Sequence, residues 1–229
     1  MNGAKRALLY SLRYPIMVYR RLFLDLHVWG RENIPKGPKI YVTNHVTSTD
    51  PFWVWPEFTE AVHIVIGPGY QSPILAKVLD AFEQINCMPA HRKSVVEKAV
   101  SYLKKGEAVY MAPEGDLQEL FQLGRFYPGV ARMYCRVQAP IVPIALVAPK
   151  HAMREYPRFD DVVDGRVYRM VPVLKGTYCI NIGVPLQPEL PDESPERQEE
   201  FVTTLLKQRM NELMQEVRTN KFWLSPRGR

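Results

Sequence analysis

The stretch IYVTNHVTSTDPF, residues 40–52, runs from an apolar segment through a turn into a helix start. Residues 40–43 have the β-branched and aromatic composition of a strand. Asp50 followed by Pro51 is typical of a helix N-terminus, with the aspartate as N-cap and the proline in the first turn. The stretch therefore predicts a strand that leads through a turn rich in serine and threonine into a helix.

His45 and Asp50, on either side of this turn, have the residue types of a general base and its orienting carboxylate. Five positions along a helix would leave their side chains about 140° apart, and five along a strand would put them on opposite faces. They can meet only where the chain folds back between strand and helix. The carboxylate could then accept the imidazole Nδ1–H, leaving Nε2 free to deprotonate a substrate hydroxyl. These residues alone leave open an ordinary alternative, a polar strand end followed by a helix cap.

Strands and helices alternate along the rest of the chain. Further strands are predicted at 26–29, 62–66, 107–112 and 140–148, and helices at 72–82, 94–105, 129–137 and from 194 onward. Ser94 and Glu97 have the spacing of a capping box, and residues 167–174 and 177–186 are predicted to pair as a hairpin. The alternation predicts a single α/β domain, residues 26–229, with a mixed, partly parallel central sheet flanked by helices.

The composition fits a globular protein with a substantial core, since 46% of the 229 residues are hydrophobic. Three scattered cysteines, Cys87, Cys135 and Cys179, have no CxxC spacing. That pattern favours a reducing compartment and gives no indication of a zinc site. We expect no metal and no redox cofactor, and the segment at the N-terminus lacks the pattern of a cleaved signal peptide.

The first 25 residues are predicted to form a basic amphipathic helix that precedes the domain. Residues 1–24 contain no acid, and their basic residues are Lys5, Arg6, Arg13, Arg20 and Arg21. Such a helix can lie in a membrane interface, with its arginines at anionic headgroups and its apolar face in the acyl boundary. The expected location is the cytoplasmic face of a membrane, peripheral or monotopic. The alternative is an ordinary surface helix packed on the domain; binding to nucleic acid is not favoured.

Four segments, in order, resemble the motifs of the glycerophospholipid acyltransferase family, the lysophosphatidate acyltransferase or PlsC-like group. The first is the NHxSxxD motif, with Asn44, His45, Thr47 and Asp50; INCMPAHR ends in Arg92; APEG supplies Pro113, Glu114 and Gly115; and IVPIAL supplies Pro143. The resemblance covers residues 26–186, most of the chain. HxxxxD alone is a loose pattern, but four motifs in the right order are specific.

The resemblance implies an enzyme that moves an acyl group from a thioester, on coenzyme A or acyl carrier protein, to a lipid hydroxyl at a membrane surface. His45 would be the general base and Asp50 would orient it. Arg92, Glu114 and Gly115 would bind the acceptor, whereas Pro143 would be structural. Because no acyl-enzyme is needed, Cys87 is not a candidate nucleophile. The ordinary alternatives are a solvated charge for Arg92 and a simple turn for the PEG segment.

The third motif departs from the family pattern EGTRS. Here the sequence reads EGDLQE, so that Asp116 replaces the threonine and Leu117 replaces an arginine that helps to bind phosphate. The change removes a cation and adds negative charge, although Arg125 could substitute. It predicts an acceptor other than plain lysophosphatidate, such as a less phosphorylated or glycosylated lipid. A non-catalytic lipid-binding relative is the competing interpretation.

Overall fold

Seven strands form one sheet in the order β1-β9-β6-β2-β5-β3-β4 in the computed structural model, which describes residues 3–58 and 60–219. The strands are β1 (Leu24–Trp29), β2 (Ile40–Thr43), β3 (Val62–Ile66), β4 (Ile85–Asn86), β5 (Ala108–Met111), β6 (Ile141–Val147) and β9 (Gly176–Ile182), with β7 (Asp161–Val163) and β8 (Arg166–Tyr168) in a separate pair. The helices are α1 (Gly3–Phe23), α2 (Asp50–Val54), α3 (Pro73–Ala81), α4 (Val95–Lys104), α5 (Gly129–Val137) and α6 (Pro195–Thr219).

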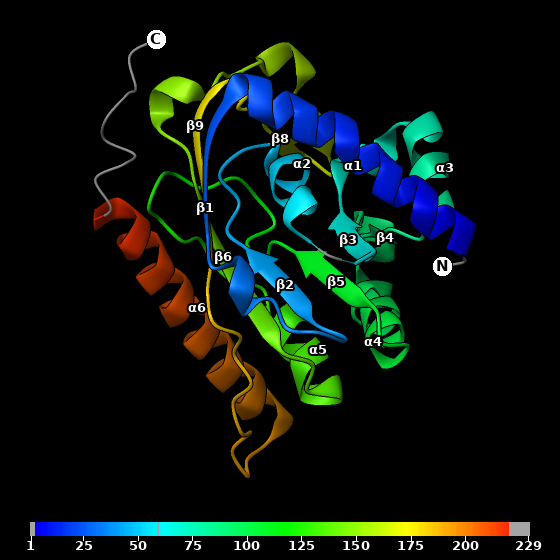
Figure 1. Ribbon diagram of the computed structural model, residues 1–229. Coiled ribbons are helices and arrows are strands. Elements are labelled where there is room, and N and C mark those ends of the chain that lie inside the picture. The colour runs from blue at the N-terminus through cyan, green and yellow to red at the C-terminus, as the bar shows by residue number, and fades with distance from the viewer. Residues whose placement is uncertain (1–2, 59, 220–229) are drawn as a thin grey trace.

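The strands from β6 to β4 run parallel, whereas β9 is antiparallel to β6, and β1 runs parallel to β9. The predicted mixed, partly parallel sheet flanked by helices is confirmed (Figure 1). Neighbouring parallel strands end at the same edge of a sheet, where α/β proteins place their ligand sites. The segments after β2 and β5 therefore emerge side by side at the carboxyl edge.

Alternating residues of the central strands face two different helical layers, because side chains in a strand point to opposite faces in turn. Ile40 and Val42 pack with α4, α5 and α6 on one side. Tyr41 and Tyr110 pack on the other side with α2 and the inner face of α1. Both layers are buried, so that β2 is buried along its whole length.

The predicted hairpin around Lys175 and Gly176 is wrong. Strand β8 pairs with β7, and β9 instead lies between β1 and β6 in the main sheet. Between β6 and β9 the chain makes an excursion, residues 148–175, that carries the β7–β8 hairpin. The pairing was predicted wrongly because both segments have apolar residues at alternating positions, and this pattern alone does not determine which strand pairs with which.

Two local predictions about helix residues also need correction. Ser94 stands at the N-cap of α4, but its hydroxyl donates to the His91 carbonyl at 2.9 Å and makes no capping bond. The sequence predicts Phe201, Leu205, Leu213 and Val217 as the packed face of the last helix. Leu213 and Val217 are buried in α6, but Phe201 is 41% exposed, and Val202 and Leu206 are buried in place of Phe201 and Leu205. A helical stripe drifts by a residue when neighbouring positions are both apolar.

Helix α1 turns part of its polar side toward the domain. Arg20 is buried in an ion pair with Glu57, Arg13 donates to the Pro56 carbonyl at 2.8 Å, and Tyr19 stacks on Trp53. Arg20 is therefore not available for the headgroup role expected from the sequence. The exposed large apolar residues of the helix are Leu8, Leu12, Tyr14, Met17, Val18, Leu22 and Phe23.

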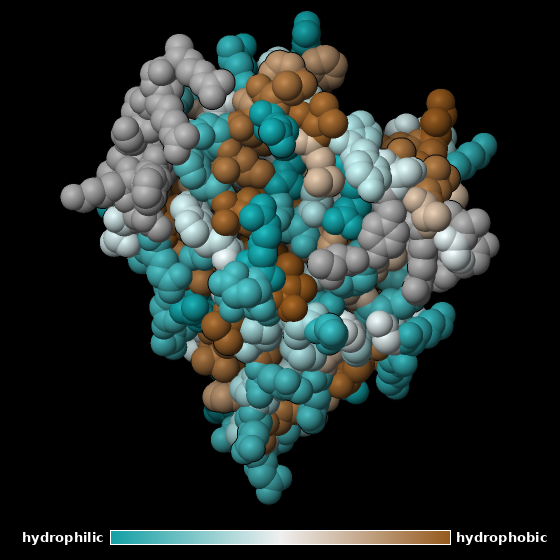
Figure 2. All heavy atoms as spheres, in the orientation of Figure 1, coloured by the Kyte–Doolittle hydropathy of each residue, from teal (hydrophilic) through white to brown (hydrophobic). Residues whose placement is uncertain are grey.

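These apolar residues face outward, so α1 contacts the domain and still presents an apolar surface. In Figure 2, brown apolar side chains reach the surface over α1 and α3 among teal polar ones. Across residues 3–58 and 60–219, no helix has the length and apolarity needed to cross a membrane.

Candidate active site

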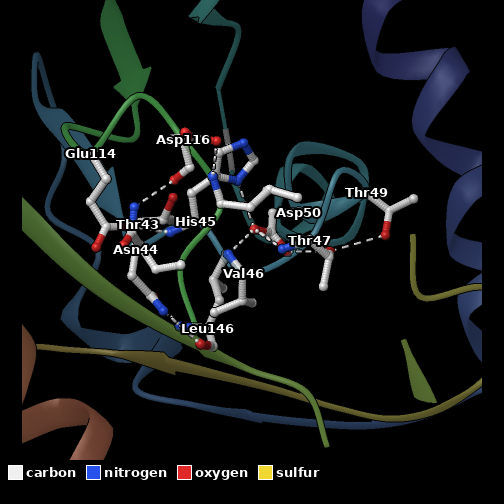
Figure 3. A network of polar contacts seen from close by, with 12 residues as sticks. Thr43, Asn44, His45, Val46, Thr47, Thr49, Asp50, Glu114, Asp116 and Leu146 are labelled. Atoms are coloured by element: carbon white, nitrogen blue, oxygen red, sulfur yellow. Dashed lines mark hydrogen bonds and ion pairs between the residues drawn. The ribbon is translucent and has the colours of Figure 1, made fainter. Parts of the chain in front are cut away.

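His45 and Asp50 meet at the carboxyl edge of the sheet, as the turn between β2 and α2 predicted. The His45 Nδ1 lies 2.9 Å from Asp50 Oδ2, and Figure 3 shows the two side chains turned toward each other. The Asp50 side chain is fully buried, whereas that of His45 is 26% exposed. The imidazole therefore has one nitrogen held by a buried carboxylate and retains access to solvent.

The Asp50 carboxylate is held by the turn itself and by a distant strand. Its Oδ2 also accepts the backbone N–H groups of Val46 and Thr47, at 2.8 and 2.9 Å. Its Oδ1 accepts the hydroxyls of Thr47 and Tyr178, the latter at 2.6 Å. The predicted N-cap role is thus corrected: Thr49 is the N-cap, Asp50 is the first helical residue, and its carboxylate folds back over the turn.

Glu114, which follows β5, positions the backbone of His45. Its Oε2 accepts the His45 N–H at 2.7 Å and its Oε1 accepts the Gly124 N–H at 2.8 Å. Burial raises the pKa of this carboxyl, and the two backbone hydrogen bonds oppose that effect. The Gln118 N–H donates to the His45 carbonyl at 2.7 Å, so the loop after β5 holds both sides of the His45 backbone.

The remaining motif residues of the site core have structural contacts. The Asn44 amide bonds the Leu146 backbone in both directions, at 2.9 and 2.7 Å, and ties the start of the turn to β6. The Pro113 carbonyl accepts the Tyr127 N–H at 2.9 Å. Pro143 is buried in β6, where its carbonyl accepts the Gly183 N–H at 2.8 Å. The structural role expected for Pro143 fits this placement.

Arg92 and Gly115 lie toward the exposed rim. Arg92 belongs to the 3-10 segment η4 (Pro89–Ser94), and its Nη2 is 3.5 Å from Tyr168 Oη on the β7–β8 hairpin. Gly115 has a φ of 64°, a left-handed conformation that glycine adopts readily. Arg125 lies over the ring of Tyr127, with its guanidinium carbon 5.8 Å from the centroid. An acceptor contact for Arg92 and Gly115 stays a prediction.

Tyr178 is a site residue that sequence reasoning missed. Burial and the Asp50 charge raise the pKa of its hydroxyl well above the ordinary value, so it remains a proton donor. It comes from β9, far along the chain from the turn, and no motif singled it out.

Burial raises the pKa of the Cys87 thiol, so the thiol stays protonated, which agrees with its exclusion as a nucleophile.

Residues 25–147 match the family model described as Acyltransferase, which is more than half of the chain. The chain belongs to the glycerophospholipid acyltransferase family. The matched region includes the His45–Asp50 turn, Glu114 and the whole of β6, and it ends before the excursion and before Tyr178.

Several curated acyltransferases are similar in sequence over part of their length. The chain is 25% identical to the chloroplastic 1-acyl-sn-glycerol-3-phosphate acyltransferase of Arabidopsis thaliana over 138 residues, 55% of this chain and 36% of that protein. It is 28% identical to a probable 1-acyl-sn-glycerol-3-phosphate acyltransferase of Mycoplasma pneumoniae over 148 residues, 57% of this chain and 54% of that protein. The matches thus span about a third to a half of those relatives' length.

A solved acyltransferase has the same fold. The crystal structure of the 1-acyl-sn-glycerophosphate acyltransferase PlsC from Thermotoga maritima superposes with a TM-score of 0.69 at 19% identity, covering 96% of this chain and 84% of that one. The similarity therefore extends over β9 and α6, beyond the region of sequence similarity.

Proposed function

We propose that this protein transfers a fatty acyl group from an acyl thioester, on coenzyme A or acyl carrier protein, to a hydroxyl of a lysophospholipid. The observation that carries the proposal is the His45–Asp50 pair, in which a buried carboxylate holds Nδ1 of a partly exposed imidazole. The relatives' names, which specify 1-acyl-sn-glycerol-3-phosphate as substrate, support the acceptor class.

The pair would act by general base catalysis. His45 donates its Nδ1–H to Asp50, so that Nε2 carries a lone pair and accepts the proton of the acceptor hydroxyl. The acceptor oxygen then attacks the thioester carbonyl, and the tetrahedral intermediate collapses to the ester with release of the thiolate. The imidazolium returns its proton to the thiolate. Asp50 stabilises the imidazolium meanwhile, and no covalent enzyme intermediate forms.

A thiol-release assay with oleoyl-CoA tests the assignment. Wild-type protein should release free thiol only when a lysophospholipid is present, and His45→Ala should lower that rate by about 10³-fold or more, as removal of a catalytic base does. His151→Ala is the matched control, because His151 is an exposed histidine on the 3-10 segment η5 (Lys150–Ala152). Circular dichroism and thermal melting confirm folding. Retained turnover in folded His45→Ala would refute the base assignment.

The outward face of α1 would bring this site to a membrane, on the cytoplasmic side. Exposed Val18 and Leu22, 57% and 69% accessible, can enter the acyl boundary while Arg20 stays paired with Glu57 inside. The sequence predicted this apolar contact together with arginines at the headgroups, and the difference is that Arg20 would take no part, because it is paired with Glu57.

Flotation with phosphatidylcholine and phosphatidylglycerol vesicles tests this contact. Changing Val18→Ser and Leu22→Ser together should lower the membrane partition coefficient by about a hundredfold or more, since burial of each such side chain contributes about 1.5–3 kcal/mol. Val184→Ser, at a 59% exposed valine after β9, is the control and should bind as wild type does. Equal binding of all three proteins would show that α1 is not the anchor.

A further inference from the structure

The excursion between β6 and β9 brings two arginines, Arg166 and Arg169, to the third-motif loop. Its base is fastened to the first-motif turn, where the Ser48 N–H donates to the Val171 carbonyl at 3.1 Å and the Trp53 Nε1–H to the Val173 carbonyl at 2.9 Å. Its far end is tied to the 3-10 segment η3 (Pro68–Gln71), because Gln71 Nε2 donates to the Val162 carbonyl at 3.0 Å. The hairpin is thus held across the carboxyl edge.

Arg92, Arg166 and Arg169 form the arginine cluster, and each contacts the loop or the hairpin. Arg166 Nη2 lies 3.3 Å from Asp116 Oδ2, and Arg169 Nη2 lies 3.4 Å from the Leu117 carbonyl. The Arg166 guanidinium also lies over the Tyr168 ring, 5.6 Å from its centroid, while Arg92 approaches the Tyr168 hydroxyl. Arg166 and Arg169 therefore lie at Asp116 and Leu117, and Tyr168 joins Arg92 to Arg166.

The arginine cluster changes what the EGDLQE sequence implies about the cations near the site. Leu117 is buried, with 9% exposure, and its own side chain cannot provide the cation that the family pattern places there. Asp116, the other departure from the pattern, is the carboxylate that holds Arg166. A guanidinium has five N–H donors, more than one carboxylate oxygen can accept, and the Arg166 side chain is 37% exposed. The loop thus has no cation of its own at this position, and Arg166 of the hairpin places one there.

We propose that Arg166 and Arg169, together with Arg92, bind the phosphate group of the acyl acceptor. This inference rests on the proposed function and reverses the expectation of a less phosphorylated lipid. Planar guanidinium groups donate paired N–H groups to phosphate oxygens, which gives charge-assisted bonds of defined geometry. The exposed position of Arg92 and Arg169 leaves both accessible to a ligand.

The position of the cluster favours the acceptor over the donor. Asp116 lies on the loop that holds the His45 backbone through Glu114 and Gln118. An acceptor hydroxyl must reach His45 Nε2, and in a lysophosphatidate the phosphate is only a few bonds from that hydroxyl. In an acyl-CoA, the long pantetheine arm separates the thioester from the phosphates. A cluster that contacts the loop holding the base therefore fits the acceptor phosphate.

Steady-state kinetics with two acceptors of equal chain length test the proposal. Oleoyl-CoA is the donor, and the acceptors are 1-oleoyl lysophosphatidate and neutral 1-oleoylglycerol. Arg166→Gln and Arg169→Gln should each lower the preference for the phosphate-bearing acceptor by about tenfold, through a higher KM for lysophosphatidate, because one hydrogen bond to a charged group is lost. Arg158→Gln is the matched control, an exposed arginine of the same excursion that lies over the Phe159 ring.

Two kinetic results would overturn the assignment. One is an equal loss with both acceptors, which would mean a general structural role. The other is a higher KM for oleoyl-CoA with no change for lysophosphatidate, which would place the phosphates of the donor at the cluster. Thermal melting shows whether each variant is folded, and two independent arginine variants guard against a folding defect in one.

Binding of sn-glycerol 3-phosphate, with glycerol as the uncharged control probe, separates failure of this inference from failure of the proposed function. Calorimetry on the His45→Ala background should show binding of the phosphate compound that Arg166→Gln weakens by about tenfold and Arg158→Gln does not. If no acceptor supports thiol release but this difference holds, the proposed function fails and the phosphate site stands. If thiol release is normal and the two arginine variants bind alike, the phosphate site is refuted.

Discussion

Two aspartates of this protein lie near the same histidine and are held in opposite ways. Asp50 is fully buried, and its oxygens accept the imidazole, two backbone N–H groups and two hydroxyls. Asp116 is 31% exposed; its carboxylate accepts the Leu117 N–H and pairs with Arg166 at 3.3 Å. The first carboxylate is fixed from several directions, whereas the second is held by one neighbouring backbone N–H and one partly exposed arginine.

Under the proposed function, this difference matches two separate tasks of the site. A buried carboxylate surrounded by donors cannot move without leaving donors unsatisfied, which costs about 1–3 kcal/mol for each. An exposed ion pair contributes only about 0–1 kcal/mol and can rearrange around a ligand. Under the proposed function, the turn after β2 would place the base precisely, whereas the partly exposed Asp116–Arg166 pair could rearrange around the acceptor.

Asp50→Asn should have the larger effect of the two matched substitutions. Asparagine has no charge to stabilise the imidazolium and can hold the wrong tautomer of His45, so kcat should fall by about 10³-fold or more with every acceptor. Asp116→Asn is the control with the same chemical change, and it should alter kcat by less than about threefold, because the pair it breaks is partly exposed. Thiol release with oleoyl-CoA measures both.

Comparable losses of kcat in these two variants would contradict the different roles of the two aspartates. If Asp116→Asn lowered kcat with neutral 1-oleoylglycerol as strongly as Asp50→Asn, then Asp116 would belong to the catalytic group rather than to the rim. Thermal melting of both proteins is needed beside the kinetics, since loss of a buried charge also changes the hydrogen bonds of Val46 and Thr47.

The sequence predicts the first region well because its interactions are local. His45 and Asp50 are separated by one turn, and a strand, a turn and a helix start are all visible in the residues between 40 and 52. The alternation of strands and helices likewise predicted the mixed sheet. The role of Asp50 as helix cap was wrong in detail, because its carboxylate could bond either the helix or the preceding turn and both are equally close in sequence.

The second region could not be predicted in the same way because it depends on contacts between distant segments. Asp116 and Leu117 implied a lost cation, yet Arg166 comes from a hairpin about 50 positions later. The partner of strand β8 was also predicted wrongly, since β8 was expected to pair with β9 but pairs with β7. Tyr178 is a similar case: its strand was predicted, but the neighbours of that strand, and so the target of its hydroxyl, were not.

Tyr178→Phe should have a smaller effect than Asp50→Asn and tests directly how Asp50 is held. The variant removes one hydrogen bond to Asp50 Oδ1 and leaves that of Thr47, so kcat should fall by about tenfold while the KM values stay unchanged. Because burial and the Asp50 charge keep the pKa of the Tyr178 hydroxyl well above its ordinary value, the hydroxyl donates at every ordinary assay pH. The loss should therefore be the same from neutral to mildly alkaline pH.

The control for Tyr178 is Tyr110→Phe, which removes another buried tyrosine hydroxyl, one that pairs with Thr43 at 2.9 Å and not with Asp50. Both variants should lose similar stability, about 1 kcal/mol, but only Tyr178→Phe should lower kcat. In the Asp50→Asn background, Tyr178→Phe should cause little further loss, because residues that act through one carboxylate are not additive. Equal effects of the two tyrosines on kcat would mean that general packing, rather than the hydrogen bond to Asp50, governs the rate.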